Sequence, residues 1–433
     1  MTSTNEGQGL AAAAGGLTEA TILPLAEPAA QHDLLVLAIL STLLAFASIS
    51  TDLYLPAMPA MGRALHAGTG AIAFTVSGYL IGFSVGQLVW GPISDRYGRR
   101  LPIAIGLVLF VIGAAGCALS VNAGEMIFWR VVQALGACAG VVLARAMVRD
   151  LYEGNRAAQM LSTLMTVMGI APLLGPLIGG QILLLASWRA IFWVLVVVGL
   201  ATLAAMLLLP ETLPPARRNH EPLGHAAARY LSLLRQRRVI GYIGAGAFFF
   251  GGAFAGIAGT PFAYIGYYHV VPQLYGLLFG AGIIGMMATN VLNARLVVRF
   301  GTVALLRVGT SVAMVAAVML AADAHFGWGG LAGLVLPLVL FMGCNGLIVA
   351  NSIAGALAAF PERAGAVSAL AGALQYGTGI VGSAMVGAFA DGTPWPMGWV
   401  IATSGVGGAL CAWLIVPTPT KLAVALAPKC DAG

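Results

Sequence analysis

The sequence predicts an all-α integral membrane protein with twelve transmembrane helices in two pseudo-symmetric six-helix halves. Of its 433 residues, 60% are hydrophobic and only 8% are charged, whereas soluble domains carry roughly 25% charged residues. Apolar runs of about 20 residues, the length that crosses a bilayer as a helix, recur along the chain. Because these runs are too long for the strands of a membrane barrel, each is predicted to be a helix.

The predicted spans form two groups of six. The first group covers 34–56, 71–91, 101–121, 126–148, 159–183 and 187–209, and the second covers 240–264, 274–294, 302–322, 330–351, 364–389 and 395–416. The predicted organisation is a disordered cytoplasmic tail at 1–33, a six-helix bundle at 34–209, a cytoplasmic linker at 210–238, a second bundle at 239–416 and a cytoplasmic tail at 417–433.

Arginine placement predicts the orientation in the membrane. The loops after even-numbered spans carry most arginines, including six in the central polar stretch, whereas the opposite loops carry only Arg63 and Arg189. Positive loops stay in the cytoplasm, so both termini are predicted to be cytoplasmic. The net charge of +6 is explained by this bias, and no nucleic-acid partner is expected.

The first 33 residues contain no Lys or Arg. A secretory signal peptide has a positive start before its apolar core, so this segment is interpreted as a tail. The five cysteines are scattered without metal-ligand spacing and are interpreted as packing residues. No metal is expected.

One short connection concentrates charge and glycine between two apolar spans. It is Gly91–Arg100, with the sequence GPISDRYGRR, and it follows the second predicted span. The second half holds a degenerate copy in which Arg299-Phe300-Gly301 aligns with Arg96-Tyr97-Gly98 and Val298 takes the position of Asp95. Six spans on each side of a basic linker are typical of parallel repeats that flank a midplane site and open it alternately.

Two formal charges lie deep in the predicted spans, Asp52 and Arg130. A charge in hydrocarbon is costly, which makes each a functional candidate. Asp52 comes late in a span that rises from the cytoplasm and Arg130 comes early in one that descends, so both lie at similar depth and could face one cavity. Gln133 is one turn along from Arg130 on the same helix face. A static pair, an Asp52 at the membrane boundary and a purely structural Arg130 remain alternatives.

The connection Gly91–Arg100 closely resembles the loop signature of the major facilitator superfamily, whose fold has this arrangement of two six-helix halves. The resemblance implies a conformational switch formed by Gly91, Asp95, Arg96, Gly98, Arg99 and Arg100. It implies that Asp95 binds the N-terminus of the eleventh span in the outward-open state, near 361–363. Arg145 and Arg149 are further candidate partners of Asp95.

Other motifs resemble proton-driven exporters of the same superfamily. The run 128–137 (FWRVVQALGA) resembles the fourth-span motif whose arginine is implicated in proton coupling, and 171–180 (APLLGPLIGG) resembles the fifth-span antiporter motif. The matching positions of that antiporter motif are Pro172, Gly175, Pro176, Gly179 and Gly180. With 51–59 (TDLYLPAMP) and 187–192 (SWRAIF), residues 34–416 are similar to the bicyclomycin- and chloramphenicol/florfenicol-resistance exporters.

Substrate-binding candidates are aromatic and amide side chains at middle depth. They are Tyr54, Gln133, Phe249, Phe254, Asn345, Gln375 and Tyr376. Each of them could instead be a packing residue.

These observations predict a proton-driven exporter of small amphipathic drugs from the bacterial cytoplasm, working by alternating access. A transporter of one metabolite, such as an amino acid or sugar derivative, is the alternative. The chain is not expected to be an enzyme, because no catalytic cluster lies in the spans, and no cofactor is expected, because the proton gradient would supply the energy. The expected partners are a drug, protons and the lipid bilayer, around a monomer in the inner membrane.

Overall fold

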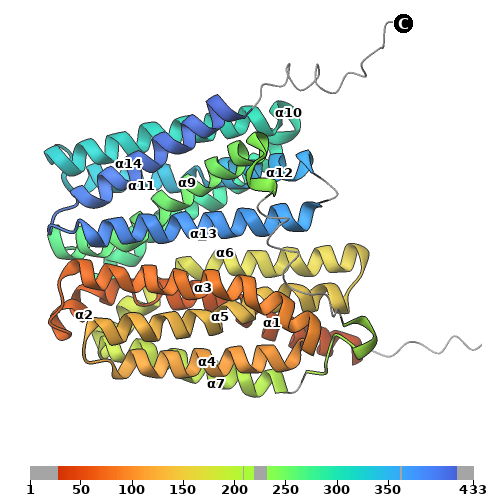
Figure 1. Cartoon of the computed structure of the whole chain (residues 1–433). Coiled ribbons are helices and arrows are strands. Elements are labelled where there is room, and N and C mark those ends of the chain that lie inside the picture. Colours follow the sequence, from red (N-terminus) through yellow and green to blue (C-terminus); the bar gives the residue numbers. More distant parts are fainter. Residues whose placement is uncertain (1–27, 208, 219–231, 361–362, 417–433) are drawn as a thin grey trace, which may run out of the picture.

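The computed structural model describes residues 28–207, 209–218, 232–360 and 363–416 as two bundles of long helices lying side by side (Figure 1). The first bundle holds α1 (Pro28–Asp52), η1 (Leu55–Ala57), α2 (Met58–Ala64), α3 (Thr69–Tyr97), α4 (Arg100–Leu119), α5 (Ala123–Leu151), α6 (Gly154–Leu185) and α7 (Trp188–Leu207). The second holds α9 (Arg237–Thr260), η3 (Pro261–Tyr267), α10 (Pro272–Phe326), α11 (Gly330–Gly343), α12 (Asn345–Ala359), α13 (Ala364–Ala388), α14 (Trp395–Leu410) and η5 (Cys411–Ile415). The short helix η2 (Pro215–Arg217) follows the first bundle.

Eleven helices within the described residues are long and apolar enough to cross a membrane. The longest, α10, contains two of the predicted spans, because its path turns at Gly301, where φ is 77° and ψ is 164°. Counting the two arms of α10 separately accounts for the twelve predicted spans. The all-helical fold class is therefore confirmed, with α11 and α12 forming one span.

The predicted domain boundaries differ from the helix ends at a few places. Helix α1 begins at Pro28, so residues 28–33 of the predicted tail are helical. The remainder of that tail, the C-terminal tail 417–433 and residues 219–231 of the predicted linker lie outside the described residues. Helix α9 begins at Arg237, close to the predicted end of the linker.

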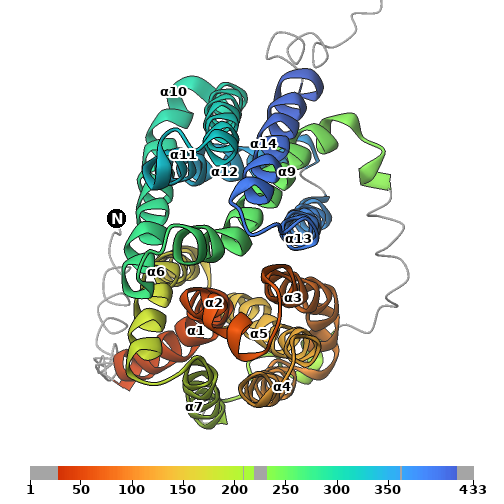
Figure 2. The same ribbon diagram turned by 90° about the vertical axis from the view of Figure 1, so that its left-hand side faces the viewer.

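Most contacts between the bundles come from two helix pairs, α3 with α13 and α6 with α10. The view in Figure 2 looks along the helices and shows these pairs at the seam between the bundles. We call the end of the molecule at η1 and α2 the α2 end, and the opposite end, where Glu211 follows α7, the Glu211 end. Small residues permit the close approach of helices, and the seam uses them near the α2 end.

Contacts between the bundles are tight near the α2 end. A Cβ added at Gly70 of α3 would collide with the carbonyl oxygen of Gly387 in α13. Further along the same pair, Ser77 and Ser383 share a buried hydrogen bond of 2.8 Å. On the other side of the seam, a Cβ at Gly276 would lie 2.8 Å from the backbone of Leu177. The bundles therefore meet without a gap for side chains at this end.

Candidate transport site

A cavity of about 270 Å³ lies between the two bundles. Its walls come from α1, α3 and α6 of the first bundle and from α9 to α13 of the second. Phe83 of α3 approaches Tyr376 of α13 with ring centroids 5.0 Å apart, and Phe250 and Phe254 each lie 6.1 Å from the same Tyr376 ring. The wall is mostly aromatic and aliphatic, which suits a ligand with a large apolar surface.

Among the described residues that line this cavity, Asp52 contributes the one formal charge. Its side chain is buried, and none of the hydrogen bonds or ion pairs among the described residues uses its carboxylate. Polar neighbours in the lining are few: Ser48, Thr51, Thr260 and Asn345, together with tyrosine hydroxyls. A buried carboxylate in such surroundings is available to a proton or to a cationic group of a ligand.

Helix α6 determines where Asp52 lies. A Cβ at Gly175 would be 2.9 Å from the Cβ of Asp52, and one at Gly179 would collide with the carbonyl oxygen of Leu53. Gly180 faces Pro272 of α10 instead, and a Cβ added at Gly180 would be 2.9 Å from the carbonyl oxygen of Pro272. The glycines of the predicted antiporter motif thus bring α6 against α1 on one side and the second bundle on the other. Pro172 and Pro176 lie inside this one helix, and Pro172 lines the cavity.

Arg130 lies behind the cavity wall and does not line the cavity. Its guanidinium stacks between two rings, 4.2 Å from the centroid of Tyr54 and 4.4 Å from that of Tyr79. It donates hydrogen bonds to the carbonyl oxygen of Ser50 at 2.9 Å and to Oε1 of Gln133 at 2.7 Å. Cation–π stacking and these bonds hold the charge against the last turn of α1, two residues from Asp52.

Unpartnered polar atoms gather around this guanidinium. Nε and Nη2 of Arg130, Nε2 of Gln133 and Oγ of Ser50 are buried without a protein hydrogen-bond partner. Three of these four atoms can only donate, and an unpaired buried donor is costly. The arrangement therefore favours an acceptor or an anion in this region.

The structure brings together some predicted substrate residues and separates others. Of the seven candidates, Phe249, Phe254, Asn345 and Tyr376 line the cavity. Tyr54, Gln133 and Gln375 are buried outside the described lining. Tyr54 is stacked on Arg130 as described, and its hydroxyl is 3.0 Å from that of Thr75.

Sequence reasoning missed Tyr79 and Phe83 of α3, which face the cavity. They are four residues apart and therefore share one helix face. That spacing of two aromatic residues beside several glycines in 78–86 was the available signal. Tyr79 touches the cavity on one side and the Arg130 guanidinium on the other.

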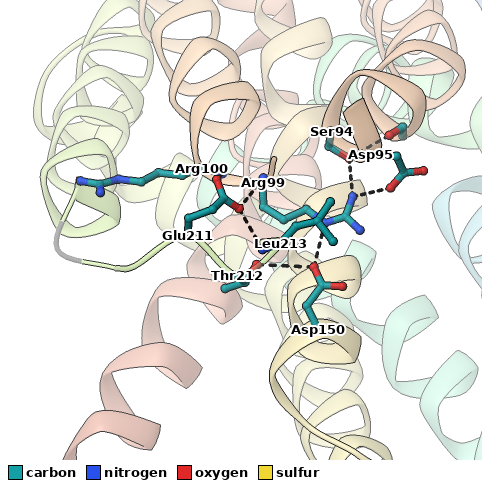
Figure 3. Close-up of polar contacts among 9 residues, drawn as sticks. Ser94, Asp95, Arg99, Arg100, Asp150, Glu211, Thr212 and Leu213 are labelled. Carbon is teal, nitrogen blue, oxygen red and sulfur yellow. Dashed lines mark hydrogen bonds and ion pairs between the residues drawn. The ribbon is translucent and has the colours of Figure 1, made fainter. Parts of the chain in front are cut away.

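A second polar site lies at the Glu211 end, on the predicted switch loop (Figure 3). The Arg99 guanidinium forms ion pairs with Asp95 at 2.6 Å and with Asp150 of α5 at 2.8 Å, and it donates to Oγ of Ser94 at 2.7 Å. Asp95 is therefore paired within its own loop in this structure. Of the predicted partners of Asp95, residues 361–362 lie outside the described residues. Among the described residues, Arg145 has its one polar contact with Met168, and no ion pair joins Asp95 to Arg149.

Glu211 connects the same loop to the segment after α7. Its carboxylate accepts backbone hydrogen bonds from Arg99 at 2.8 Å and Arg100 at 3.1 Å, at the N-terminus of α4, and from Leu213 at 3.0 Å. A carboxylate at a helix N-terminus is stabilised by the unpaired N–H groups there. Although partial burial opposes ionisation, these donors and the nearby Arg218 hold the pKa of Glu211 below its usual range.

The remaining switch-loop residues have different surroundings. Gly98 has a φ of 91°, which favours glycine. A Cβ added there would be 2.6 Å from Oε2 of Glu211. Gly91 has open space around it, Arg96 lies over the ring of Tyr97, and Arg100 donates to the carbonyl oxygen of Leu207 at 2.5 Å. The role of Glu211 was not expected from the sequence, although it is an acidic residue beside an otherwise basic stretch.

A family model described as the Major Facilitator Superfamily matches residues 39–383. The chain is 34% identical over 393 residues to an uncharacterised MFS-type transporter, YdgK, of Bacillus subtilis, covering 89% of this chain and 96% of that one. It is 31% identical to a bicyclomycin resistance protein homolog of Haemophilus influenzae (84% and 91% covered) and 31% identical to a chloramphenicol resistance protein of Pseudomonas aeruginosa (81% and 83%).

The fold is similar to a solved structure of the Escherichia coli xylose transporter XylE in a partially occluded inward open conformation. The TM-score is 0.68 at 16% sequence identity, with 90% of this chain and 99% of that one covered. At this identity the likeness concerns the fold alone.

Proposed function

Because this chain belongs to the major facilitator superfamily, and is therefore a multi-pass membrane transporter, we propose that it exports small amphipathic drugs from the bacterial cytoplasm in exchange for protons. The observation that carries the proposal is the cavity between the bundles, whose apolar wall contains the carboxylate of Asp52 and, among the described residues, no other formal charge. Relatives named as bicyclomycin, chloramphenicol and multidrug resistance proteins support drug efflux.

The arginine bias of the loops supports an orientation with the Glu211 end in the cytoplasm. The tight contacts of Gly70 with Gly387 and of Gly276 with Leu177 then close the outer side. In this state substrate enters from the cytoplasm. Rocking of the bundles about the cavity would break these contacts and open the outer side.

Asp52 is the proposed site of proton coupling. When substrate occupies the cavity the carboxylate gives up its proton, and when substrate leaves on the outer side it takes one up. Arg130 cannot release a proton, and its proposed role is to stabilise the ionised carboxylate from behind the wall. Each charge that moves inward contributes about 2.3 kcal/mol per 100 mV of membrane potential.

The wall favours drugs over a sugar-like metabolite. A polyhydroxylated ligand would need many hydrogen-bonding groups, because each buried unpaired hydroxyl costs about 1–3 kcal/mol. The lining supplies few of them beside its phenylalanines, methionines and leucines.

Exchange of Asp52 for Asn tests the coupling. We expect Asp52→Asn to reduce drug accumulation in energised inverted vesicles by more than tenfold, on the order of a single essential proton-transfer group. The substrates are labelled chloramphenicol and bicyclomycin, and the second readout is the partial reversal of acridine-dye quenching when drug is added. The matched control is Asp323→Asn, because Asp323 is also a buried carboxylate but is absent from the cavity lining.

Full resistance in cells that express Asp52→Asn at the parental level would refute the assignment of Asp52. The direction of transport has a separate test. Drug accumulation in inverted vesicles that survives an uncoupler, or that needs ATP, would contradict proton-driven export.

A further inference from the structure

Arg145 of α5 is exposed although the residues around it in the helix are buried. Ala144, Ala146, Met147 and Val148 are all buried, whereas Arg145 is exposed. Its Nη2 lies 3.9 Å from the sulfur of Met168 in α6. Met168 is one of the residues that line the cavity, so this face of α5 is directed toward the cavity side of α6.

The second bundle contributes to the same location. The Arg145 guanidinium is within Coulombic range of the hydroxyl of Tyr376 in α13 and of the thiol of Cys138. Tyr376 also lines the cavity. Arg145 therefore lies near the C-terminus of α5, toward the Glu211 end, and contacts Met168 of the cavity lining.

Arg145 is far from Asp52 along the length of α5. Fifteen residues separate Arg145 from Arg130 in the same helix, which corresponds to about 22 Å at a rise of 1.5 Å per residue. Arg130 is packed against the last turn of α1 that carries Asp52. A ligand near Arg145 is thus far from the buried carboxylate and experiences the opposite charge.

No carboxylate within the described residues pairs with Arg145, since both ion pairs there belong to Arg99. The guanidinium is instead next to the thioether of Met168, a weak acceptor that leaves the guanidinium donors available. A guanidinium with free donors binds a carboxylate through two parallel hydrogen bonds. An apolar wall beside it strengthens the attraction.

We propose that Arg145 is an anion-binding subsite at the rim of the cavity, which selects amphipathic compounds carrying one carboxylate. The apolar body of such a compound lies against Met168 and Tyr376, and its carboxylate accepts hydrogen bonds from the guanidinium. This subsite rests on the proposed export function, because it assigns a substrate class to the entrance of the same cavity.

Binding to purified full-length protein in detergent tests the subsite with 2-naphthoate and its uncharged analogue 2-naphthamide. We expect Arg145→Ala to raise the Kd for naphthoate about tenfold, as loss of one charge-assisted bidentate contact would, with the Kd for naphthamide changed less than about twofold. Arg145→Lys should retain part of the preference for naphthoate, since it keeps the charge but not the planar fork.

Arg149→Ala is the matched control, because Arg149 is also exposed, one turn further along α5. It should leave both affinities unchanged. An equal loss of naphthoate binding in Arg149→Ala would show a general positive field and overturn the subsite, as would an unchanged Kd in Arg145→Ala. A parent protein that does not bind naphthoate overturns the subsite, whereas the export proposal is decided separately by the vesicle assay with chloramphenicol and bicyclomycin.

Discussion

The two halves of the molecule contain the same loop turn with very different chemistry around it. In the first half, Gly98 turns the chain between α3 and α4 with a φ of 91°, and in the second half Gly301 turns it within α10 with a φ of 77°. Arg96 lies over Tyr97 in one loop and Arg299 over Phe300 in the other. The repeat therefore extends to the backbone and to one cation–π contact.

The difference begins at the neighbouring positions. Asp95 is bound by Arg99, which also binds Asp150, and Glu211 accepts hydrogen bonds from the backbone of the same loop. The position equivalent to Asp95 is Val298, which is 89% exposed, and a Cβ at Gly301 would have no atom within 4 Å. Within the described residues, both halves keep the same turn geometry, but only the first half has a polar network that holds the loop to its bundle.

Replacement of Arg99 in the first loop and of Arg299 in the second should give the largest difference in stability between the loops. Arg99→Ala leaves Asp150, whose side chain is only 15% exposed, without its ion pair. Loss of one partner from a largely buried pair costs about 3 kcal/mol, so we expect that decrease in the free energy of unfolding, measured by SDS titration of purified protein. Arg299→Ala in the other loop should change it by less than about 0.5 kcal/mol. Equal changes in the free energy of unfolding for the two variants would mean that the ion pairs of Arg99 add nothing beyond a positive charge in the loop.

Alanine at the two turn glycines should separate backbone strain from the contact with Glu211. Both substitutions force a side chain into a glycine conformation, at a cost of about 2 kcal/mol each. Gly98→Ala also displaces the Glu211 carboxylate, which lies 2.6 Å from the added Cβ, and should cost about 1 kcal/mol more for the lost backbone hydrogen bonds. The same SDS titration measures both. If Gly301→Ala is the more damaging change, the contact with Glu211 is not the source of the difference.

The smallest expected effect is a pH dependence confined to the first loop. The pKa of Glu211 is lowered from its ordinary value of 4.5 in the folded protein. Its stabilising contribution is therefore complete above that value and is lost as the pH falls through the folded-state pKa. We expect the difference in unfolding midpoint between the parent and Glu211→Gln to be constant near neutral pH and to shrink below about pH 4.5. A difference in unfolding midpoint that does not vary with pH would mean that Glu211 stabilises the loop independently of the charge on its carboxylate.

Hydropathy and charge were sufficient to predict the membrane helices, because a bilayer admits only segments that satisfy their own backbone hydrogen bonds. The turn at Gly301 was visible as a degenerate repeat of Arg96-Tyr97-Gly98, although the structure joins both arms into one long α10. The charges Asp52 and Arg130 could be selected in the same way, since hydrocarbon makes them expensive. These predictions depend on the solvent and on local sequence, and both are readable along the chain.

Which side chains meet was decided by the tertiary structure. Tyr54 and Tyr79 are both tyrosines in apolar spans, yet Tyr79 reaches the cavity and Tyr54 is enclosed beside Arg130. The pairing of Glu211 with the N-terminus of α4 joins residues more than a hundred positions apart. A helix has several faces, and membrane hydropathy does not distinguish a face toward lipid from one toward a neighbouring helix. Only the packing of α3 against α13 and of α6 against α1 and α10 assigns those faces, and with them the walls of the cavity.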